Sequence, residues 1–254
     1  MRSTIGAALF VLGCAGMTQW AAARQTAKPA PPTAYLAPSE LPDPRTYLPG
    51  PPAPGTPAHA ADRAAYAAAL AGKGGAAWNE AAGQVRLRSP AVEQGLMCAV
   101  GARLDPTPAS AYGRLLARAA VTLGEASEAA KSIWKRDRPF VGDPAPAVCD
   151  PSALGGTPSP SYPGGHAGVG WLWGLMLSEL APDRAGELLR WGAALGDNRV
   201  ACRVHFPSDI AAGRMMGAAI YARLHSVPAF RADMAAARVE LAAARTGGPP
   251  AGCD

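Results

Sequence analysis

Aromatic residues are scarce in this sequence. Phe, Trp and Tyr together make up 6% of the 254 residues. The core must therefore be built from closely packed small residues with scattered Leu, Met and Trp, a composition that suits helices better than sheets. Segments that alternate polar and apolar residues, as half-buried strands do, are hardly visible. The sequence predicts an all-α fold, a single-domain helical bundle.

Long runs of like charge and long apolar runs are also missing. The 24 basic and 19 acidic residues leave a net charge of +5, and no run of five or more like charges marks a nucleic-acid-binding tail. We therefore expect no nucleic-acid partner, whereas the modest positive balance suits a small anionic substrate. No segment of the mature chain reaches the roughly 20 apolar residues of a membrane span, so we expect no membrane span in the mature chain.

The N-terminal part of the chain has the layout of an export signal. Residues 1–23 combine a short basic start, an apolar stretch and small residues, and cleavage after Ala23 fits an A-x-A pattern. A second interpretation is a lipoprotein signal, in which Cys14 carries a lipid anchor. Residues 24–58 are crowded with proline, which favours extended chain, so we expect a tether or belt over a helical domain at residues 59–254.

The cysteines lack the C-x-x-C spacing of a structural zinc site. Once the signal is removed, an even number remains in a chain bound for an oxidising compartment, which predicts two disulfides. Buried free thiols are the alternative, and three pairings are open. These cysteines are Cys98, Cys149, Cys202 and Cys253.

Apolar periodicity predicts the helices of the bundle. The expected helices cover residues 61–72, 89–104, 107–136, 166–180, 182–198, 208–224 and 229–245. The longest begins at Thr107 as N-cap, with Pro108 at the first helical position. It is expected to end near Asp137, because Pro139 disfavours helical geometry at the residue before it.

The segment KSIWKRDRP, residues 131–139, carries the first candidate binding groups. Lys131 and Arg138 are seven positions apart, which is two helical turns, and so can project from the same side of a helix. The alternative is a solvated basic helix end, which suits the helix dipole.

The segment SYPGGHAG, residues 161–168, lies at the start of a predicted helix. Gly164 and Gly165 allow backbone amides to approach an anion closely, and the helix N-terminus adds further donors. His166 can donate a proton near neutral pH. The alternative is an ordinary turn in which this histidine caps the helix.

The segment NRVACRVHFPSD, residues 198–209, places Arg199, His205 and Asp209 on a predicted turn between two helices. A carboxylate four residues after a histidine can hold one ring nitrogen and leave the other free to attack. This is the His–Asp half of a nucleophilic relay. The alternative is that His205 caps the following helix together with Ser208 and Asp209.

In their order and spacing the three segments resemble the signature K-x6-RP, PSGH and SR-x5-H-x3-D. It belongs to the acid phosphatase branch of the type 2 phosphatidic acid phosphatase and vanadium haloperoxidase superfamily. The matching residues are Lys131, Arg138, Pro139, Pro163, Gly164, Gly165, His166, Arg199, His205 and Asp209. The flanking helices look similar to the secreted bacterial class A nonspecific acid phosphatases. Gly164 and Asn198 depart from the signature, which has serine at both places.

The resemblance implies a periplasmic or secreted bacterial acid phosphatase that hydrolyses phosphomonoesters without a metal ion or cofactor. It implies that His205, oriented by Asp209, attacks phosphorus to form a phosphohistidine, and that His166 protonates the leaving alcohol. The groups expected to bind the phosphate are Lys131, Arg138, Gly164, Gly165 and Arg199. Because Gly164 keeps its amide but lacks a hydroxyl, we expect slower or altered catalysis. The open alternatives are a vanadate-dependent haloperoxidase and a noncatalytic phosphate- or phospholipid-binding protein.

Overall fold

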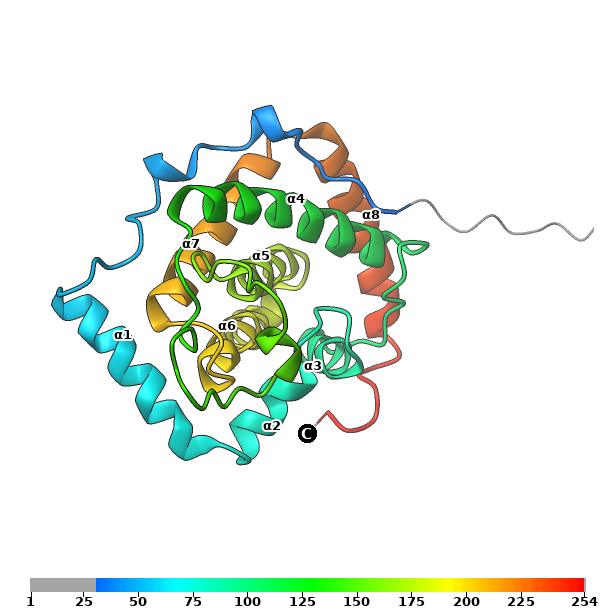
Figure 1. Cartoon of the computed structure of the whole chain (residues 1–254). Coiled ribbons are helices and arrows are strands. Elements are labelled where there is room, and N and C mark those ends of the chain that lie inside the picture. The colour runs from blue at the N-terminus through cyan, green and yellow to red at the C-terminus, as the bar shows by residue number, and fades with distance from the viewer. Residues whose placement is uncertain (1–30, 254) are drawn as a thin grey trace, which may run out of the picture. The chain divides into compact units, whose positions relative to one another are not determined.

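A computed structural model describes residues 31–253 of the chain. The signal peptide predicted over residues 1–23 and the candidate lipidation site Cys14 lie outside this range. The described residues form α-helices, 3-10 helices, turns and irregular chain, with no strand among them (Figure 1). This confirms the all-α prediction. The α-helices are α1 (Pro57–Ala68), α2 (Ala76–Gly83), α3 (Pro90–Val100), α4 (Ala111–Trp134), α5 (Gly165–Leu180), α6 (Ala185–Ala201), α7 (Pro207–Leu224) and α8 (Pro228–Arg245).

Helices α5 and α6 lie at the centre of the bundle, with the other helices around them (Figure 1). They approach closely because glycines face each other. A Cβ built on Gly192 of α6 would lie only 2.4 Å from the carbonyl oxygen of Gly170 on α5. On the opposite side, a Cβ on Gly217 of α7 would lie 2.6 Å from the carbonyl oxygen of Gly168. The small residues therefore bring the start of α5, the end of α6 and the start of α7 together, and these ends carry the second and third motifs, residues 161–168 and 198–209.

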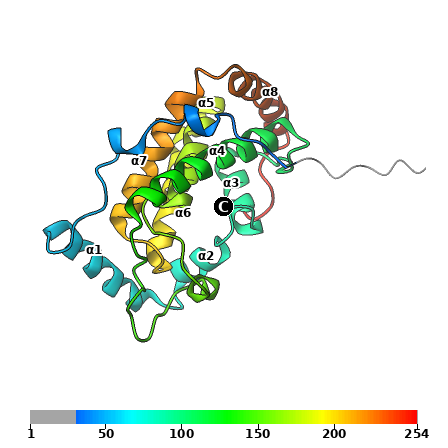
Figure 2. The ribbon, with the colours of Figure 1, turned by 45° about the horizontal axis from the view of Figure 1, so that its top comes forward.

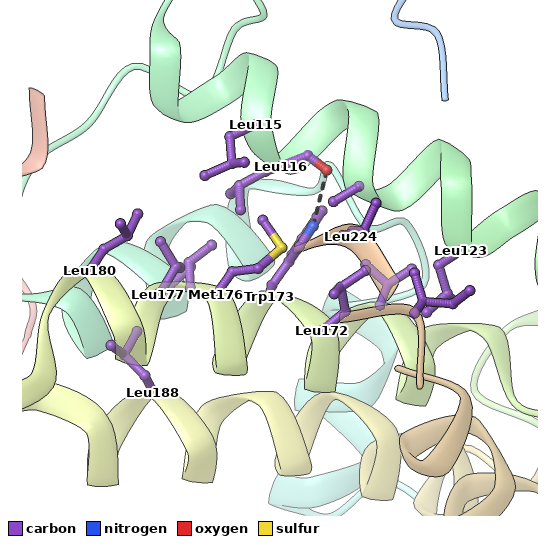
Figure 3. Close-up of a cluster of buried hydrophobic side chains, with 14 of the residues drawn as sticks. Leu115, Leu116, Leu123, Leu172, Trp173, Met176, Leu177, Leu180, Leu188 and Leu224 are labelled. Carbon is purple, nitrogen blue, oxygen red and sulfur yellow. Dashed lines mark hydrogen bonds between the residues drawn. The ribbon is translucent and has the colours of Figure 1, made fainter. Parts of the chain in front are cut away.

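The main core lies between α4, α5, α7 and α8. Leucine and methionine side chains fill it around Trp173, whose indole N–H donates to the carbonyl oxygen of Leu116 at 3.0 Å across the α4–α5 interface (Figure 3). Phe230, Met234 and Leu241 form the buried face of α8 against this core. No helix within residues 31–253 has both the length and the apolar character that crossing a membrane requires.

The described part of the proline-rich segment runs across α4 toward α7 before it enters α1 (Figures 1 and 2). Tyr35, Leu36 and Leu48 of this segment are buried in the main core. The Tyr35 hydroxyl donates to the Asp233 carboxylate of α8 at 2.7 Å, so the segment is fastened to the bundle by a polar contact as well. The predicted domain boundary between residues 58 and 59 stays a prediction.

The predicted ends of α4 are wrong. The helix begins at Ala111, because Ser110 is the N-cap and its hydroxyl accepts from the Gly113 N–H at 2.8 Å. Thr107 instead donates to Asp105 in the turn before the helix. The helix ends at Trp134, since Lys135 has a left-handed conformation with φ 47°. Helix α2 was not predicted, because its short alanine-rich sequence lacks a clear apolar period.

The four cysteines pair as Cys98–Cys253 and Cys149–Cys202, which confirms the two predicted disulfides. The first joins α3 to the chain after α8. The second joins the long loop between α4 and α5 to the end of α6. Closing loops of 155 and 53 residues stabilises the fold by about 4 to 5 kcal/mol each in the chain-entropy account. The second disulfide also holds the loop beside the motif at residues 198–209.

Candidate active site

A cavity of about 290 Å³ lies between the loop after α4, the start of α5 and the end of α6. The predicted site residues that line it are Arg138, His166, Arg199 and His205. Its rim comes from the loop that precedes α5 and includes Asp150 and Ser159. Residues from three distant motifs therefore face one cavity, whose lining carries two guanidinium groups, two imidazole rings and one carboxylate.

Arg199, on the last turn of α6, is buried with unsatisfied donors. Its side chain is 5% exposed, and neither Nε nor Nη1 has a hydrogen-bond partner in the described structure. Its Nη2 lies 4.0 Å from the Asp150 carboxylate across the cavity. Burial, together with the charge of Arg138, lowers the Arg199 pKa to about 10 despite that carboxylate. A bound anion would satisfy these donors, since buried polar groups are nearly always paired.

Arg138 reaches the cavity from the loop after α4. Its Nε donates to the Ser159 carbonyl at 2.8 Å, and its Nη1 donates to the Val204 carbonyl at 2.9 Å. Because α4 ends at Trp134, the expectation that Arg138 projects from the same helix face as Lys131 is wrong. The turn after the helix directs Arg138 to the site instead. Burial lowers the pKa of its guanidinium, which is nevertheless always charged at working pH.

The contact between Arg138 and His205 identifies the tautomer of the histidine. Nη1 of Arg138 lies 3.0 Å from Nε2 of His205, and a guanidinium can only donate, so Nε2 is the acceptor. The ring proton is then on Nδ1, which faces Oδ2 of Asp209 at 3.4 Å. Burial, with the charges of Arg138 and Arg199, lowers the His205 pKa to about 4. The histidine is therefore neutral above that pH, with a lone pair on the nitrogen that faces Arg138.

Asp209 holds both His205 and the start of α7. Its side chain is fully buried, and Oδ2 accepts from the Phe206 N–H at 2.8 Å in addition to the histidine. Burial opposes the charged form, but the His205 hydrogen bond and the Arg136 charge lower the Asp209 pKa overall. Orientation of a histidine and capping of a helix, which were alternatives in the sequence, are thus both functions of this carboxylate.

His166, on the first turn of α5, is held by a backbone carbonyl. Its Nε2 lies 3.0 Å from the carbonyl oxygen of Val85, in the segment between α2 and α3. A carbonyl only accepts, so Nε2 carries a proton and Nδ1 is the nitrogen left for other partners. Burial, with the positive charge of Arg199 as the next largest cause, lowers the His166 pKa to about 3.

The two glycines at the start of α5 differ in what they offer an anion. Gly164 is the N-cap, and its N–H donates to the Asp209 carbonyl at 2.9 Å, so the expectation that this amide binds the phosphate is wrong. The Gly165 N–H belongs to the first helical turn, whose donors have no partner within the helix. A Cβ on Gly164 would lie 3.1 Å from that same Asp209 carbonyl oxygen. Close packing of α7 on this turn favours glycine where the signature has serine.

Lys131 lies at the edge of the site and does not line the cavity. On the last turn of α4, its Nζ pairs with Glu128 at 2.9 Å and donates to the Ser159 hydroxyl at 3.3 Å. Its side chain is only 11% exposed, whereas that of Glu128 is 68% exposed. The ammonium group therefore contacts Ser159, which lines the cavity together with the two arginines.

Sequence reasoning missed several groups that support the site. Asn198, which stands in place of the signature serine, donates to Glu80 at 3.0 Å and to Gln84 at 2.8 Å. These bonds fasten α2, and the Val85 carbonyl that follows it, to the end of α6. In the sequence, the only sign of these hydrogen bonds between α6 and α2 is the asparagine beside Arg199. Among residues 31–253, no three His, Cys, Asp or Glu side chains gather as a metal site.

Comparison with known proteins agrees with the motif resemblance. Residues 111–232 match the PAP2 superfamily. The chain is 36% identical over 204 residues to an acid phosphatase of Zymomonas mobilis subsp. mobilis, covering 80% of this chain and 77% of the relative. It is also 36% identical over 210 residues to a non-specific acid phosphatase of Salmonella typhimurium, covering 82% and 83% of the two chains. A non-specific acid phosphatase of Providencia stuartii is 31% identical over 211 residues, covering 82% and 84%.

Proposed function

The chain belongs to the PAP2 superfamily and is an acid phosphatase, and from that premise we propose that it hydrolyses phosphomonoesters through a phosphohistidine on His205. We further propose that the reaction needs no metal ion and takes place in the bacterial periplasm or after secretion. The observation that carries the proposal is a cavity where Arg138, His166, Arg199 and His205 meet, with buried arginine donors that lack partners. Relatives named acid phosphatases favour this activity over a haloperoxidase or a noncatalytic binding protein.

The phosphate group is held by charge and by fixed donors. Phosphoryl transfer requires mainly positioning and neutralisation of the equatorial oxygens, which guanidinium groups supply with paired N–H donors. Arg199 offers its free Nε and Nη1. When an oxygen of the substrate takes the Nη1 donor of Arg138, the lone pair on His205 Nε2 becomes free. The first-turn N–H groups of α5, including that of Gly165, and Lys131 at the rim complete the binding site.

His205 then attacks the phosphorus atom in line with the leaving oxygen. The Nε2–P bond forms as the P–O bond to the alcohol breaks, and the bond electrons go to the alcohol oxygen, which takes a proton from Nδ1 of His166. Asp209 stabilises the imidazolium that develops on His205. In the second step a water molecule gives its proton back to His166 and attacks the phosphohistidine. Phosphate leaves, and both histidines return to their starting states.

Burial and neighbouring positive charges keep both histidine rings neutral, so His166 must gain its proton together with the substrate. Burial, together with the positive charges of Arg199 and Arg138, lowers the pKa of His166 to about 3. A phosphate anion brings opposite charge next to that ring and raises its pKa. Acidic pH favours this proton uptake, while a pKa of about 4 keeps His205 neutral and nucleophilic down to that value before the phosphate binds.

The test compares matched histidine variants in the release of p-nitrophenol from p-nitrophenyl phosphate. His205→Ala is expected to lose activity by more than about 10³-fold, because no other group replaces the nucleophile. His225→Ala is the control, since that ring lies on the surface beside Glu179, away from the cavity. Incubation with EDTA is expected to leave wild-type activity unchanged. Near wild-type turnover by His205→Ala, or loss of activity in EDTA that magnesium restores, would contradict the proposal.

A further inference from the structure

A second buried charge cluster lies behind Asp209, on the side away from the cavity. It consists of Arg136, from the loop after α4, Asp62 of α1 and Ser208 at the start of α7. We propose that Arg136, anchored by Asp62, is a positioning residue that orients Asp209 and, through it, the nucleophile His205. This inference rests on the proposed function and adds α1 to the elements that build the site.

Arg136 joins two carboxylates with the two arms of its guanidinium. Nη1 donates to Asp209 Oδ1 at 2.6 Å and to the Ser208 hydroxyl at 2.7 Å, while Nη2 donates to Asp62 Oδ2 at 2.7 Å. The side chains of Arg136 and Asp62 are 9% and 4% exposed, so the charges are poorly screened by solvent. The guanidinium also lies 4.2 Å from the ring centroid of Phe206. Such a forked contact fixes direction as well as distance.

The hydrogen bonds of Asp209 divide cleanly between its two oxygens. Oδ1 accepts from Arg136, whereas Oδ2 accepts from the Phe206 N–H and faces Nδ1 of His205. Rotation of the carboxylate would break bonds at both oxygens together. Arg136 therefore keeps Oδ2 directed at the histidine. Its positive charge also attracts negative charge toward Oδ1, which reduces the negative charge on Oδ2 beside His205.

Asp62 holds the arginine from a part of the chain outside all three motifs. Its Oδ1 accepts from the Ser208 N–H at 3.1 Å, and Oδ2 accepts from both Arg136 and the Ser208 hydroxyl. Helix α1 is thereby joined to the first turn of α7, which carries Asp209. Residues 111–232, which match the superfamily, do not include Asp62.

Arg136 acts on the site without touching the substrate space. It does not line the 290 Å³ cavity, and it faces a second hollow of about 400 Å³ together with Arg63, His59 and Arg138, the last of which lines both spaces. Its replacement is therefore expected to leave phosphate binding nearly unchanged. A change in turnover with constant phosphate affinity would separate positioning from a general loss of structure.

The effect on pH follows from the groups around His205. The charged or titratable groups around His205 and Asp209 are Arg136, Arg138, His166, Arg199, Asp62, Asp150 and Tyr162. Without the positive charge of Arg136, the Asp209 carboxylate is compensated mainly by a protonated His205. Protonation of the nucleophile then begins at higher pH, so the acid limb of the kcat/KM profile moves upward.

The experiment measures pH profiles of Arg136→Gln, Arg136→Lys and Asp62→Asn with p-nitrophenyl phosphate. We expect Arg136→Gln to lower kcat by roughly 10- to 100-fold, by analogy with the loss when the outer partner of a metal-bound histidine is removed. We expect its acid limb to rise by about half a pH unit or more, and inhibition by inorganic phosphate to stay within about twofold. Lys reaches one carboxylate and not both, so Arg136→Lys should recover part of kcat.

The matched control is Asp233→Asn, which also breaks a buried ion-pair cluster. Asp233 bridges Arg114, Arg118 and the Tyr35 hydroxyl between α4, α8 and the N-terminal segment, far from the cavity. It should lower the Tm without moving the acid limb. The proposal is overturned if Arg136→Gln behaves in the same way. If Arg136→Gln does not fold, Arg136→Lys and Asp62→Asn decide by the same criteria.

Failure of the proposed function gives a different result. If the wild-type protein releases no phosphate from any monoester, the catalytic proposal is wrong, whatever the variants do. The positioning role is then read from an NMR titration of the His205 ring. A higher His205 pKa in Arg136→Gln than in wild type supports the role, and an equal pKa refutes it.

Discussion

Replacement of Asn198 by alanine tests how helix α2 supports the site. The Asn198 side chain is 9% exposed and donates to the Glu80 carboxylate at 3.0 Å and to the Gln84 amide oxygen at 2.8 Å. A hydrogen bond to a charged group contributes about 1.5 to 3 kcal/mol, and a neutral one about 0.5 to 1.5 kcal/mol. Their loss should lower the free energy of unfolding by about 2 to 4.5 kcal/mol, a large part of a typical domain stability.

The same substitution should slow catalysis more than it weakens phosphate binding. Once α2 loosens, the Val85 carbonyl no longer holds Nε2 of His166, whereas the arginines keep their own contacts. Urea unfolding gives the stability, and kcat against the inhibition constant of inorganic phosphate gives the catalytic effect. Asn79→Ala is the control, because that exposed side chain makes one bond, to Gly74, from the same helix. An Asn198→Ala protein within about 0.5 kcal/mol of wild type and with equal kcat would refute the reasoning.

Three further predictions follow from the packing and charges of the site. The kcat/KM of Gly164→Ser should exceed that of Gly164→Ala by about fivefold or more. Both variants add the same crowded Cβ, but only serine adds a hydrogen-bond donor, which contributes about 1 to 3 kcal/mol. Equal kcat/KM values for the two variants would contradict this prediction. Without phosphate, the free energy of unfolding should fall as the pH drops from about 6.5 to about 4, because the unfolded chain takes up protons that His166 and His205, with pKa values of about 3 and about 4, do not. Urea titrations across this range measure the fall, which alanine at either histidine should reduce; an unchanged slope would contradict the burial argument. Removal of the Cys149–Cys202 disulfide by paired serine substitution should cost about 4 kcal/mol and lower activity by loosening the cavity rim; full activity at unchanged Tm would exclude that role.

The sequence predicts a site residue where its side-chain type and its position within a motif both point to the same role. The side-chain type and spacing of four residues identify them in the motifs, and the structure places all four around one cavity. These residues are Arg138, His166, Arg199 and His205. The helices with continuous apolar periodicity, such as α5, were also predictable, since burial on all sides leaves a clear apolar run. The pairing of the cysteines was not, because spacing alone does not determine it.

Other parts of the site depend on contacts that no local pattern encodes. The Val85 carbonyl that holds His166 is a backbone atom, and any residue could supply it. Asp62 meets Arg136 across 74 positions of sequence, and a buried aspartate looks like a surface one until the fold is known. The amide of Gly164 was assigned to the phosphate because the approach of α7, whose Asp209 carbonyl accepts from it, could not be foreseen. In each case the local sequence allows several contacts, and the tertiary packing determines which of them forms.

Acid-quenched trapping of the reaction intermediate tests the central claim most directly. Wild-type protein is mixed with a phosphomonoester, quenched within milliseconds and digested, and the peptides are analysed by mass spectrometry under conditions that preserve phosphohistidine. The account predicts one phosphoryl group on His205, absent from His205→Ala and increased in His166→Ala when the leaving group needs no proton. Phosphate on another residue, or turnover without any covalent intermediate, would contradict it.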